Sequence, residues 1–420
     1  MPVAFGLCWY ACAKQGPATR DGAAVVDTAL GGQPANSSTN YAHAGDATGN
    51  GGNSGNGGNG GNGGEGGSGN GGSAADTPAD VSDARGRPSS PDYSEAGPVA
   101  DASGQAGGLG DAGGDAGRLD SAAGEVALCP GATQILTVGV GQQYATVQAA
   151  VDAVPSSNRS PVQIAVKAGT YQEQVTISQP FICLTGEGAT TTTITNALGT
   201  NIDTGGTVIV TGNDFSSANI AFANTGGYGS GQAVALMAEG QRQQFYSCRF
   251  VSYQDTLYVN TGTQYFRSCY IQGDTDYVFG DATAVFEDCT MNNVAAGTAV
   301  AAPRTPQNNP YGLVFLGGSL TANATTSTVG TGSVYLARPW GPYGAAAYLN
   351  VAMGGHIAAD GWTTMSSNTL AAARFWEYHS TGPGANPTNP TRATRQLTAA
   401  QAADYTVANV LAPWVPGYSP

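Results

Sequence analysis

Hydrophobic and polar positions repeat with a period of about twenty residues between positions 244 and 291. Each repeat has a strand-like run of Phe, Tyr, Val and Ile, then one cysteine, then a polar turn. Cys248, Cys269 and Cys289 mark the repeat, which is 21 and then 20 residues long. A period of this size is typical of one coil of a parallel β-helix, because a single coil cannot bury its apolar face alone and stacks on the next.

The rest of the C-terminal two thirds shows many short apolar runs separated by Gly, Asn and Ser, which predict short strands. The predicted strands are 135–138, 162–166, 181–184, 207–210, 218–222, 233–236, 312–316, 333–336 and 346–350. Positions 146–155 predict a short amphipathic helix that Thr146 caps and Pro155 ends. Such a helix would cover the open end of the solenoid, and 397–405 predicts a second capping helix. A β-sandwich is the structural alternative, but the matched repeats favour the solenoid.

Composition divides the 420-residue chain, whose net charge is −14, into unequal parts. Residues 1–128 hold 31 of the 63 glycines, and 45–128 contain almost no large apolar side chains. Such a sequence cannot bury enough surface to offset its ordering entropy. We therefore predict an export-signal remnant at 1–20, a disordered Gly-rich linker at 21–128 and a folded domain at 129–420. The Gly-rich run has no P-loop lysine, and we reject a phosphate-binding role for it.

The first residues suggest export. Positions 4–13 are apolar but too few to span a bilayer, and they are similar to the tail of a secretory or lipoprotein signal. Cys12 after Ala11 is a candidate lipidated cysteine and hence a candidate lipid anchor, although Trp9 and Tyr10 fit such a site poorly. We expect an extracellular or surface-tethered protein.

The seven cysteines and three histidines limit which disulfides, metal sites and catalytic groups the chain can form. The repeat cysteines are predicted to be reduced and buried, since free Cys packs as a small apolar residue; a disulfide between neighbours is the alternative. Cys129 and Cys183 cannot be assigned a partner from the sequence. No Cys/His cluster has metal-ligand spacing, so no metal is expected, and the scattered histidines argue against a His-based triad.

Two aspartates share a position in the repeat. Asp255 and Asp276 each follow a repeat cysteine by seven residues, so they should lie about 4.8 Å apart on adjacent coils. Two carboxyl groups this close raise the pKa of one of them, which separates a proton carrier from an anion as acid/base or nucleophilic catalysis requires. A solvated aspartate ladder at a turn is the alternative.

Ordered motifs from position 135 onward resemble those of pectin methylesterases. They are Gly-Thr-Tyr-Gln-Glu at 169–173, Gln-Ala-Val-Ala-Leu at 232–236, Tyr-Gln-Asp-Thr-Leu-Tyr at 253–258, Gly-Asp-Thr-Asp-Tyr-Val-Phe-Gly at 273–280 and Leu-Ala-Arg-Pro-Trp at 336–340. Segments 356–362 and 375–384 also look like family segments. The resemblance implies an all-β fold, a single-stranded right-handed parallel β-helix with short capping helices.

The resemblance also implies catalytic roles. Asp276 would be the nucleophile, and Asp255 the general acid and then the base. Gln254 and Gln232 would donate to the oxyanion, and Arg338 would hold Asp276 ionised by lowering its pKa. The two amides could instead form a structural ladder, and Arg338 an ordinary salt bridge.

Aromatic residues would form walls that stack on sugar rings, namely Trp340, Trp362, Tyr258 and Phe279; Trp340 could instead belong to the core. Two departures from the family pattern are mild. Ala337 stands where Gly is usual, and Tyr277-Val278 replace the commoner Phe-Ile.

The resemblance implies hydrolysis of methyl esters in pectin by a monomer, with no metal or organic cofactor and no nucleic-acid partner. Three alternatives keep the fold. The domain could be an exported thioesterase or a polysaccharide-binding β-helix without catalysis. It could also be a lyase or polygalacturonase, although the charged clusters that those enzymes need are not found.

Overall fold

A computed structural model describes residues 129–199, 201–226, 228–229, 231–322 and 329–417. The predictions for the export signal, Cys12 and the linker lie outside these residues. Within the described part of the chain, no helix is long and apolar enough to cross a membrane.

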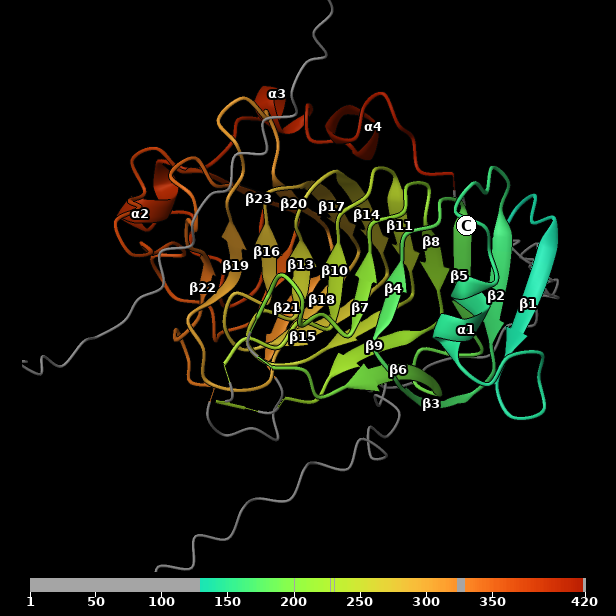
Figure 1. The fold of residues 1–420 in the computed structure, drawn as a ribbon. Coiled ribbons are helices and arrows are strands. Elements are labelled where there is room, and N and C mark those ends of the chain that lie inside the picture. Colours follow the sequence, from blue (N-terminus) through green and yellow to red (C-terminus); the bar gives the residue numbers. More distant parts are fainter. Residues whose placement is uncertain (1–128, 200, 227, 230, 323–328, 418–420) are drawn as a thin grey trace, which may run out of the picture. The chain divides into compact units, whose positions relative to one another are not determined.

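Three parallel sheets wind around one core, as the ribbon shows (Figure 1). The first sheet contains β1 (Gln134–Val138), β2 (Val162–Val166), β5 (Ile182–Gly186), β8 (Ser216–Ala218), β11 (Gln243–Tyr246), β14 (Thr263–Arg267), β17 (Thr283–Glu287), β20 (Leu313–Leu316), β23 (Ala345–Leu349) and β25 (Arg374–Tyr378). The second contains β4 (Val175–Ile177), β7 (Val208–Val210), β10 (Leu236–Ala238), β13 (Leu257–Val259), β16 (Val278–Gly280), β19 (Ala299–Pro303) and β22 (Tyr335–Ala337). The third contains β3 (Gly169–Gln172), β6 (Thr192–Asn196), β9 (Ala221–Asn224), β12 (Arg249–Val251), β15 (Tyr270–Gly273), β18 (Thr290–Asn293), β21 (Ser319–Ala322) and β24 (Ala352–Met353). Successive coils add one strand to each sheet, so the parallel β-helix is confirmed and the sandwich is excluded.

Equivalent positions on successive coils stack inside the solenoid. Phe245, Phe266, Phe286, Phe315 and Tyr348 form a column whose neighbouring ring centroids are 4.3–4.8 Å apart. These rings are fully buried. The column therefore holds the strands in register, since a slip of one residue would turn every ring outward.

The repeat cysteines form a second inward column. Cys248, Cys269 and Cys289 are buried and free, so the prediction that they are reduced is confirmed. Burial raises the pKa of the Cys248 and Cys269 thiols, which keeps them protonated and unreactive. Cys129 and Cys183, whose pairing the sequence left open, form a disulfide with their Cα atoms 5.9 Å apart.

Short helices cover the solenoid. Helix α1 (Val147–Asp152) is capped by Thr146 as predicted and contacts β1, β2 and β4, so it closes the N-terminal end (Figure 1). The Glu173 carboxylate accepts hydrogen bonds from the first two backbone N–H groups of helix α1, at 2.8 and 2.9 Å. Helices α2 (Pro390–Ala393), α3 (Ala399–Ala402) and α4 (Val407–Val410) follow near the C-terminus. The second predicted helix is thus confirmed only as the single turn α3.

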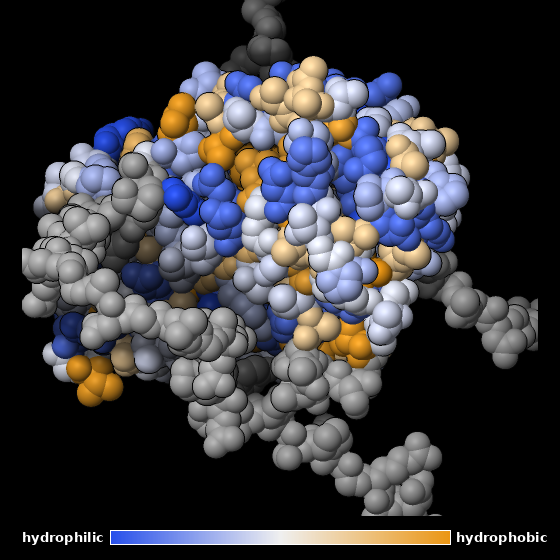
Figure 2. Space-filling model, turned by 180° about the vertical axis from the view of Figure 1, so that it is seen from behind, coloured by the Kyte–Doolittle hydropathy of each residue, from blue (hydrophilic) through white to orange (hydrophobic). Residues whose placement is uncertain are grey.

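The C-terminal segment packs on the outer side of the first sheet. Val410 and Leu411 join a small apolar cluster with Tyr265, Val285 and Val314, which point out of the solenoid. The surface seen from behind intermixes hydrophilic and hydrophobic residues (Figure 2). The C-terminal helices therefore cover apolar side chains that the sheet would otherwise expose.

Candidate active site

The two repeat aspartates lie at equivalent turns on adjacent coils. Asp255 precedes β13 and Asp276 precedes β16, and these strands pair in register. Their φ angles are 61° and 51°, a left-handed conformation that Asp tolerates better than most residues. The backbone N–H of Asp255 donates to Thr275 O and that of Asp276 donates to Ala299 O. Both side chains are nearly buried, so this is not a solvated ladder.

Arg338, just after β22, reaches Asp276. Its Nε lies 2.9 and 3.1 Å from the two carboxylate oxygens, and its Nη2 lies 2.6 Å from Oδ2. The predicted contact is therefore present as a forked ion pair, the geometry that a guanidinium favours. The Arg338 side chain keeps 21% of its surface exposed, so the pair borders on solvent.

The two acids differ in environment. Burial, followed by the charge of Asp276, raises the pKa of Asp255 to about 8, while a hydrogen bond from Gln232 opposes the rise. Burial also raises the pKa of Asp276, and Arg338 opposes that rise. Arg338 lowers the pKa of Asp276, as predicted. Burial raises this pKa by more, so the pKa of Asp276 is nevertheless above its ordinary value. Asp255, without a cationic partner of its own, is the acid that retains a proton near neutral pH.

Two glutamine residues lie close to Asp255 in the chain or in space. Gln232 and Gln254 form a parallel bridge between adjacent coils, and Gln232 Nε2 donates to Asp255 Oδ2 at 2.8 Å. Both residues are partly exposed. The Gln232 amide therefore contacts Asp255, and Gln254 directly precedes Asp255 in the chain.

Three of the four predicted aromatic residues come together on the outer side of the second sheet. The Tyr258 and Phe279 rings stack with centroids 4.3 Å apart, and Trp340 meets both at 5.8–6.1 Å. Within this group of three, Tyr258 and Phe279 are buried and Trp340 is partly exposed. Only the indole offers surface for stacking on a ligand.

Comparison with known proteins identifies the family of this chain. A family model described as Pectinesterase matches residues 135–413. The chain belongs to the pectinesterase family. It is thus a carboxylic ester hydrolase, and the solved members below are right-handed parallel β-helices.

Relatives match across most of their length. "Pectinesterase 31" of Arabidopsis thaliana is 35% identical over 258 residues, covering 57% of this chain and 80% of the relative. "Pectinesterase A" of Emericella nidulans is 38% identical over 264 residues, covering 60% and 79%. Pectin methylesterase from carrot has a TM-score of 0.62 at 29% identity, covering 67% of this chain and 94% of the carrot protein. PemA from Erwinia chrysanthemi has a TM-score of 0.61 at 27% identity, covering 69% and 99%.

The fourth aromatic residue of this pectinesterase is elsewhere. Trp362 is 2% exposed and packs in the main core, 5.1 Å from Phe375 and 6.0 Å from Tyr348 between ring centroids. It pairs with the buried Ala337 on the neighbouring strand. The prediction that Trp362 forms part of the sugar-stacking wall was therefore wrong, because its backbone register turns the indole inward.

A third carboxyl group, which the sequence analysis did not single out, lies near Asp255 and Asp276. Asp274 is 5% exposed, and its Oδ1 has no hydrogen-bond partner among the described residues. Burial is the main cause that raises its pKa to about 6. The alternation Asp-Thr-Asp at 274–276 was the available indication, but burial of both acids was not visible in it.

A second missed feature is a pair at the other end of the same strands. Asp281 follows β16 and Arg304 follows β19, and Arg304 Nε donates to Asp281 Oδ1 at 2.6 Å. The Arg304 Cζ lies 3.9 Å from the centroid of the Trp340 ring. A spacing of about one coil between Asp281 and Arg304 would have indicated the pairing.

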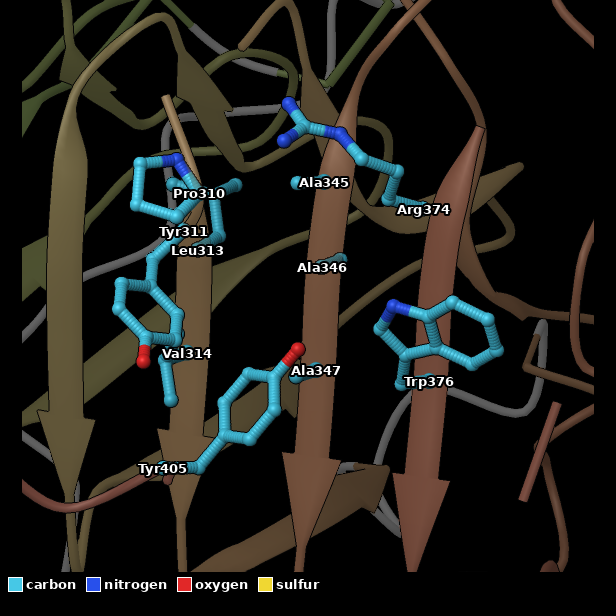
Figure 3. Close-up of a pocket in the computed structure, with 11 residues that line it drawn as sticks. Pro310, Tyr311, Leu313, Val314, Ala345, Ala346, Ala347, Arg374, Trp376 and Tyr405 are labelled. Atoms are coloured by element: carbon cyan, nitrogen blue, oxygen red, sulfur yellow. The ribbon is translucent and has the colours of Figure 1, made fainter. Parts of the chain in front are cut away.

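A hollow on the first sheet lacks this chemistry. It is lined by side chains of β20, β23 and β25 together with Tyr311 and Tyr405 (Figure 3). Its one cation, Arg374, is engaged by the carbonyl oxygens of Asn309, Pro306 and Tyr343. The lining contains no carboxyl group, so the aspartates remain the candidate active site. Among the described residues, no group of three or more His, Cys, Asp or Glu side chains is arranged to hold a metal.

Proposed function

We propose that this domain removes methyl esters from pectin, with Asp276 as the nucleophile and Asp255 as the proton carrier. The observation that carries the proposal is the unequal pair of buried acids, one bound by Arg338 and the other with its pKa raised to about 8. Such a pair can supply an anion and a proton at the same pH. The names of the relatives, pectinesterases and pectin methylesterases, support the substrate class.

In the first step, a carboxylate oxygen of Asp276 forms a bond to the carbonyl carbon of the methyl ester. The carbonyl oxygen takes up the negative charge, and the amides of Gln232 and Gln254 donate hydrogen bonds to it. Preorganised donors of this kind are worth about 2.7–4 kcal/mol each in the transition state. Gln232 already donates to Asp255 in the free protein, but an amide nitrogen carries two hydrogens, so one N–H is left for the oxyanion.

Collapse of this intermediate breaks the bond to the methoxy group. Asp255 gives its proton to the departing oxygen, methanol leaves, and an acyl anhydride remains on Asp276. Asp255, now an anion, takes a proton from water while the water oxygen attacks the acyl carbon. The acid product leaves, Asp276 returns as a carboxylate beside Arg338, and Asp255 is protonated again.

The aromatic cluster supplies the binding surface. Trp340 packs against Tyr258 and Phe279 in T-shaped contacts, and Arg304 covers one face of its ring, so the exposed remainder of the indole is a fixed surface for the apolar face of a sugar ring. A non-enzymatic polysaccharide-binding β-helix would need this platform but not the acid pair.

We also infer that the protein works outside the cytoplasm. The Cys129–Cys183 disulfide joins the start of the described domain to β5, and disulfides persist mainly in oxidising compartments. Export, surface tethering and a monomeric state are expectations to be tested on the full chain.

Methanol release from highly methylated pectin, with a chelator present, tests the proposal. We expect methanol in proportion to the carboxylates formed, without a fall in viscosity. A fall in viscosity would indicate backbone cleavage and contradict an esterase. A folded protein that releases no methanol would reject the proposal, and hydrolysis of thioesters by that protein would favour the thioesterase alternative.

A further inference from the structure

Asp274 begins the turn that carries the proposed nucleophile. It lies between β15 and β16, two residues before Asp276. Its backbone N–H donates to the carbonyl oxygen of Tyr253 on the preceding coil at 3.0 Å. The N–H of Asp255 donates in turn to the carbonyl oxygen of Thr275, the residue between Asp274 and Asp276. The backbone of Asp255 therefore lies against this turn, and three carboxyl groups share the site.

The following coil also fixes the backbone of Asp274. Its carbonyl oxygen accepts a hydrogen bond from Asn293 Nδ2 at 3.4 Å, and Asn293 is fully buried. Gly297 lies against the same carbonyl group, so close that a Cβ at this position would be 1.7 Å from the oxygen. Contacts from both neighbouring coils therefore hold the turn in place, and the Asp274 carboxyl group stays next to the acids.

The Asp274 carboxyl group is buried without a cation of its own. Its Oδ1 has no hydrogen-bond partner in the described part of the chain, and none of the ion pairs between described residues includes Asp274. Residues 294–298 of the following coil bear no charged side chain. The charge of Asp274 therefore acts on its own turn and on the preceding coil, where it faces Asp276, Tyr253 and Asp255.

Asp274 ionises at a lower pH than Asp255. Burial is the main cause that raises the pKa of Asp274 to about 6, which is still below the pKa of about 8 for Asp255. Between these values Asp274 is an anion while Asp255 holds its proton. Burial and then the charge of Asp276 contribute most to the raised pKa of Asp255, and the charge of Asp274 adds to them against Gln232 and Arg338.

We propose that Asp274 is a positioning residue for the reaction, and that its buried carboxylate keeps the proton on Asp255 until methanol departs. The inference rests on the proposed function for the role of Asp255. Like charges repel more strongly where water is excluded, and the guanidinium of Arg338 is already engaged by Asp276. Ionisation of Asp255 beside two carboxylates is therefore less favourable than beside one, and Asp255 remains an acid to higher pH.

The pH dependence of kcat/KM distinguishes this role from a structural one. Asp274→Asn keeps the shape of the side chain and removes its charge. The ratio of kcat/KM between this variant and the wild type should be close to one at pH 5, where Asp274 is itself mostly protonated. It should fall to about one third at pH 9, because Asp255 then loses its proton at lower pH.

Asp214→Asn is the matched control. It removes the same charge from a carboxylate that Arg242 binds through Nε and Nη2, and Asp214 is not among the groups that shift the pKa of Asp255. Its ratio to the wild type should be the same at pH 5 and pH 9. If Asp274→Asn does not fold, Asp274→Ser removes the charge with a smaller side chain and takes its place.

A titration without substrate tests the inference separately from catalysis. Carbon-13 NMR of the full-length protein with labelled aspartate follows the Asp255 carboxyl group, which Asp255→Asn assigns. Its titration midpoint should be lower in Asp274→Asn than in the wild type and unchanged in Asp214→Asn. An unchanged midpoint in Asp274→Asn, or equal kcat/KM ratios at pH 5 and pH 9, would overturn the inference. A lowered midpoint in a protein that releases no methanol would leave the action of Asp274 on Asp255 standing and reject the esterase.

Discussion

Two arginine–carboxylate pairs in this pectinesterase have opposite surroundings. Arg392 in α2 binds Glu377 in β25 through Nε at 2.7 Å and through Nη2, and both side chains are completely enclosed. Arg392 Nη1 also donates to Gly384 O at 2.7 Å. Arg338 and Asp276 are also forked, but they border on solvent and have Asp255 as a neighbour.

The difference lies in charge balance. The Glu377 pair is neutral as a unit and its polar atoms are satisfied, so it joins the C-terminal segment to the solenoid without chemical reactivity. At the site, the Arg338 guanidinium faces the carboxyl groups of Asp276 and Asp255, and Asp255, which has no cation of its own, is buried in its protonated form. An arginine–carboxylate pair with balanced charge therefore stabilises the fold. The same kind of pair next to a further acid can take part in proton transfer and nucleophilic attack.

The largest expected effect is on activity, when the Arg338–Asp276 pair is changed and the Arg392–Glu377 pair is left intact. Asp276→Asn should reduce methanol release about 10⁴-fold or more, because an amide cannot form the acyl intermediate. Circular dichroism and thermal melting should show a folded domain. Activity within tenfold of the wild type would reject Asp276 as the nucleophile.

Glu377→Gln should have the reverse profile. It leaves Arg392 buried without a counter-charge, which costs about 3–5 kcal/mol of unfolding free energy. Urea unfolding measures the loss, and the turnover per folded molecule should match the wild type. A variant as stable as the wild type would show that the enclosed pair is not needed to hold the C-terminal segment.

The pH profile tests the role of Asp255. Since its pKa is raised to about 8, the acid should lose its proton above that pH, and kcat/KM should fall about tenfold per pH unit. The two acids titrate as a coupled pair, so the midpoint belongs to the pair. A rate that is constant from pH 7 to 10 would contradict general-acid catalysis by Asp255.

The smallest effect concerns the stability cost of the site. An acid whose pKa is higher in the folded than in the unfolded protein favours folding below its unfolded pKa, and this contribution is lost as pH rises through the folded value. Asp255→Asn should therefore be more stable than the wild type at pH 8.5, by roughly 1 kcal/mol or more. The difference should shrink toward pH 4, which melting temperatures at the two pH values would show. A variant that is less stable than the wild type at pH 8.5 would mean that burial of the Asp255 carboxylate does not destabilise the folded protein.

Much of this architecture was predictable because a solenoid is nearly one-dimensional. The spacing of Cys248, Cys269 and Cys289 determined the coil length, and the common seven-residue offset placed Asp255 beside Asp276. Helix α1 followed from its cap and apolar face. The family motifs by themselves indicate Arg338 and the two glutamines as candidate site residues.

Only the tertiary structure decided what depends on contacts between distant segments or on the depth of burial. The Cys129–Cys183 disulfide and the Arg392–Glu377 pair each join a strand of the first sheet to a segment outside the regular repeat, where no period indicates a partner. The inward turn of Trp362 depends on its strand register. The net rise in the pKa of Asp276 depends on desolvation, which arises only when successive coils and loops exclude water. The sequence by itself thus determined which groups recur along the solenoid, and the folded structure decided which of them face water.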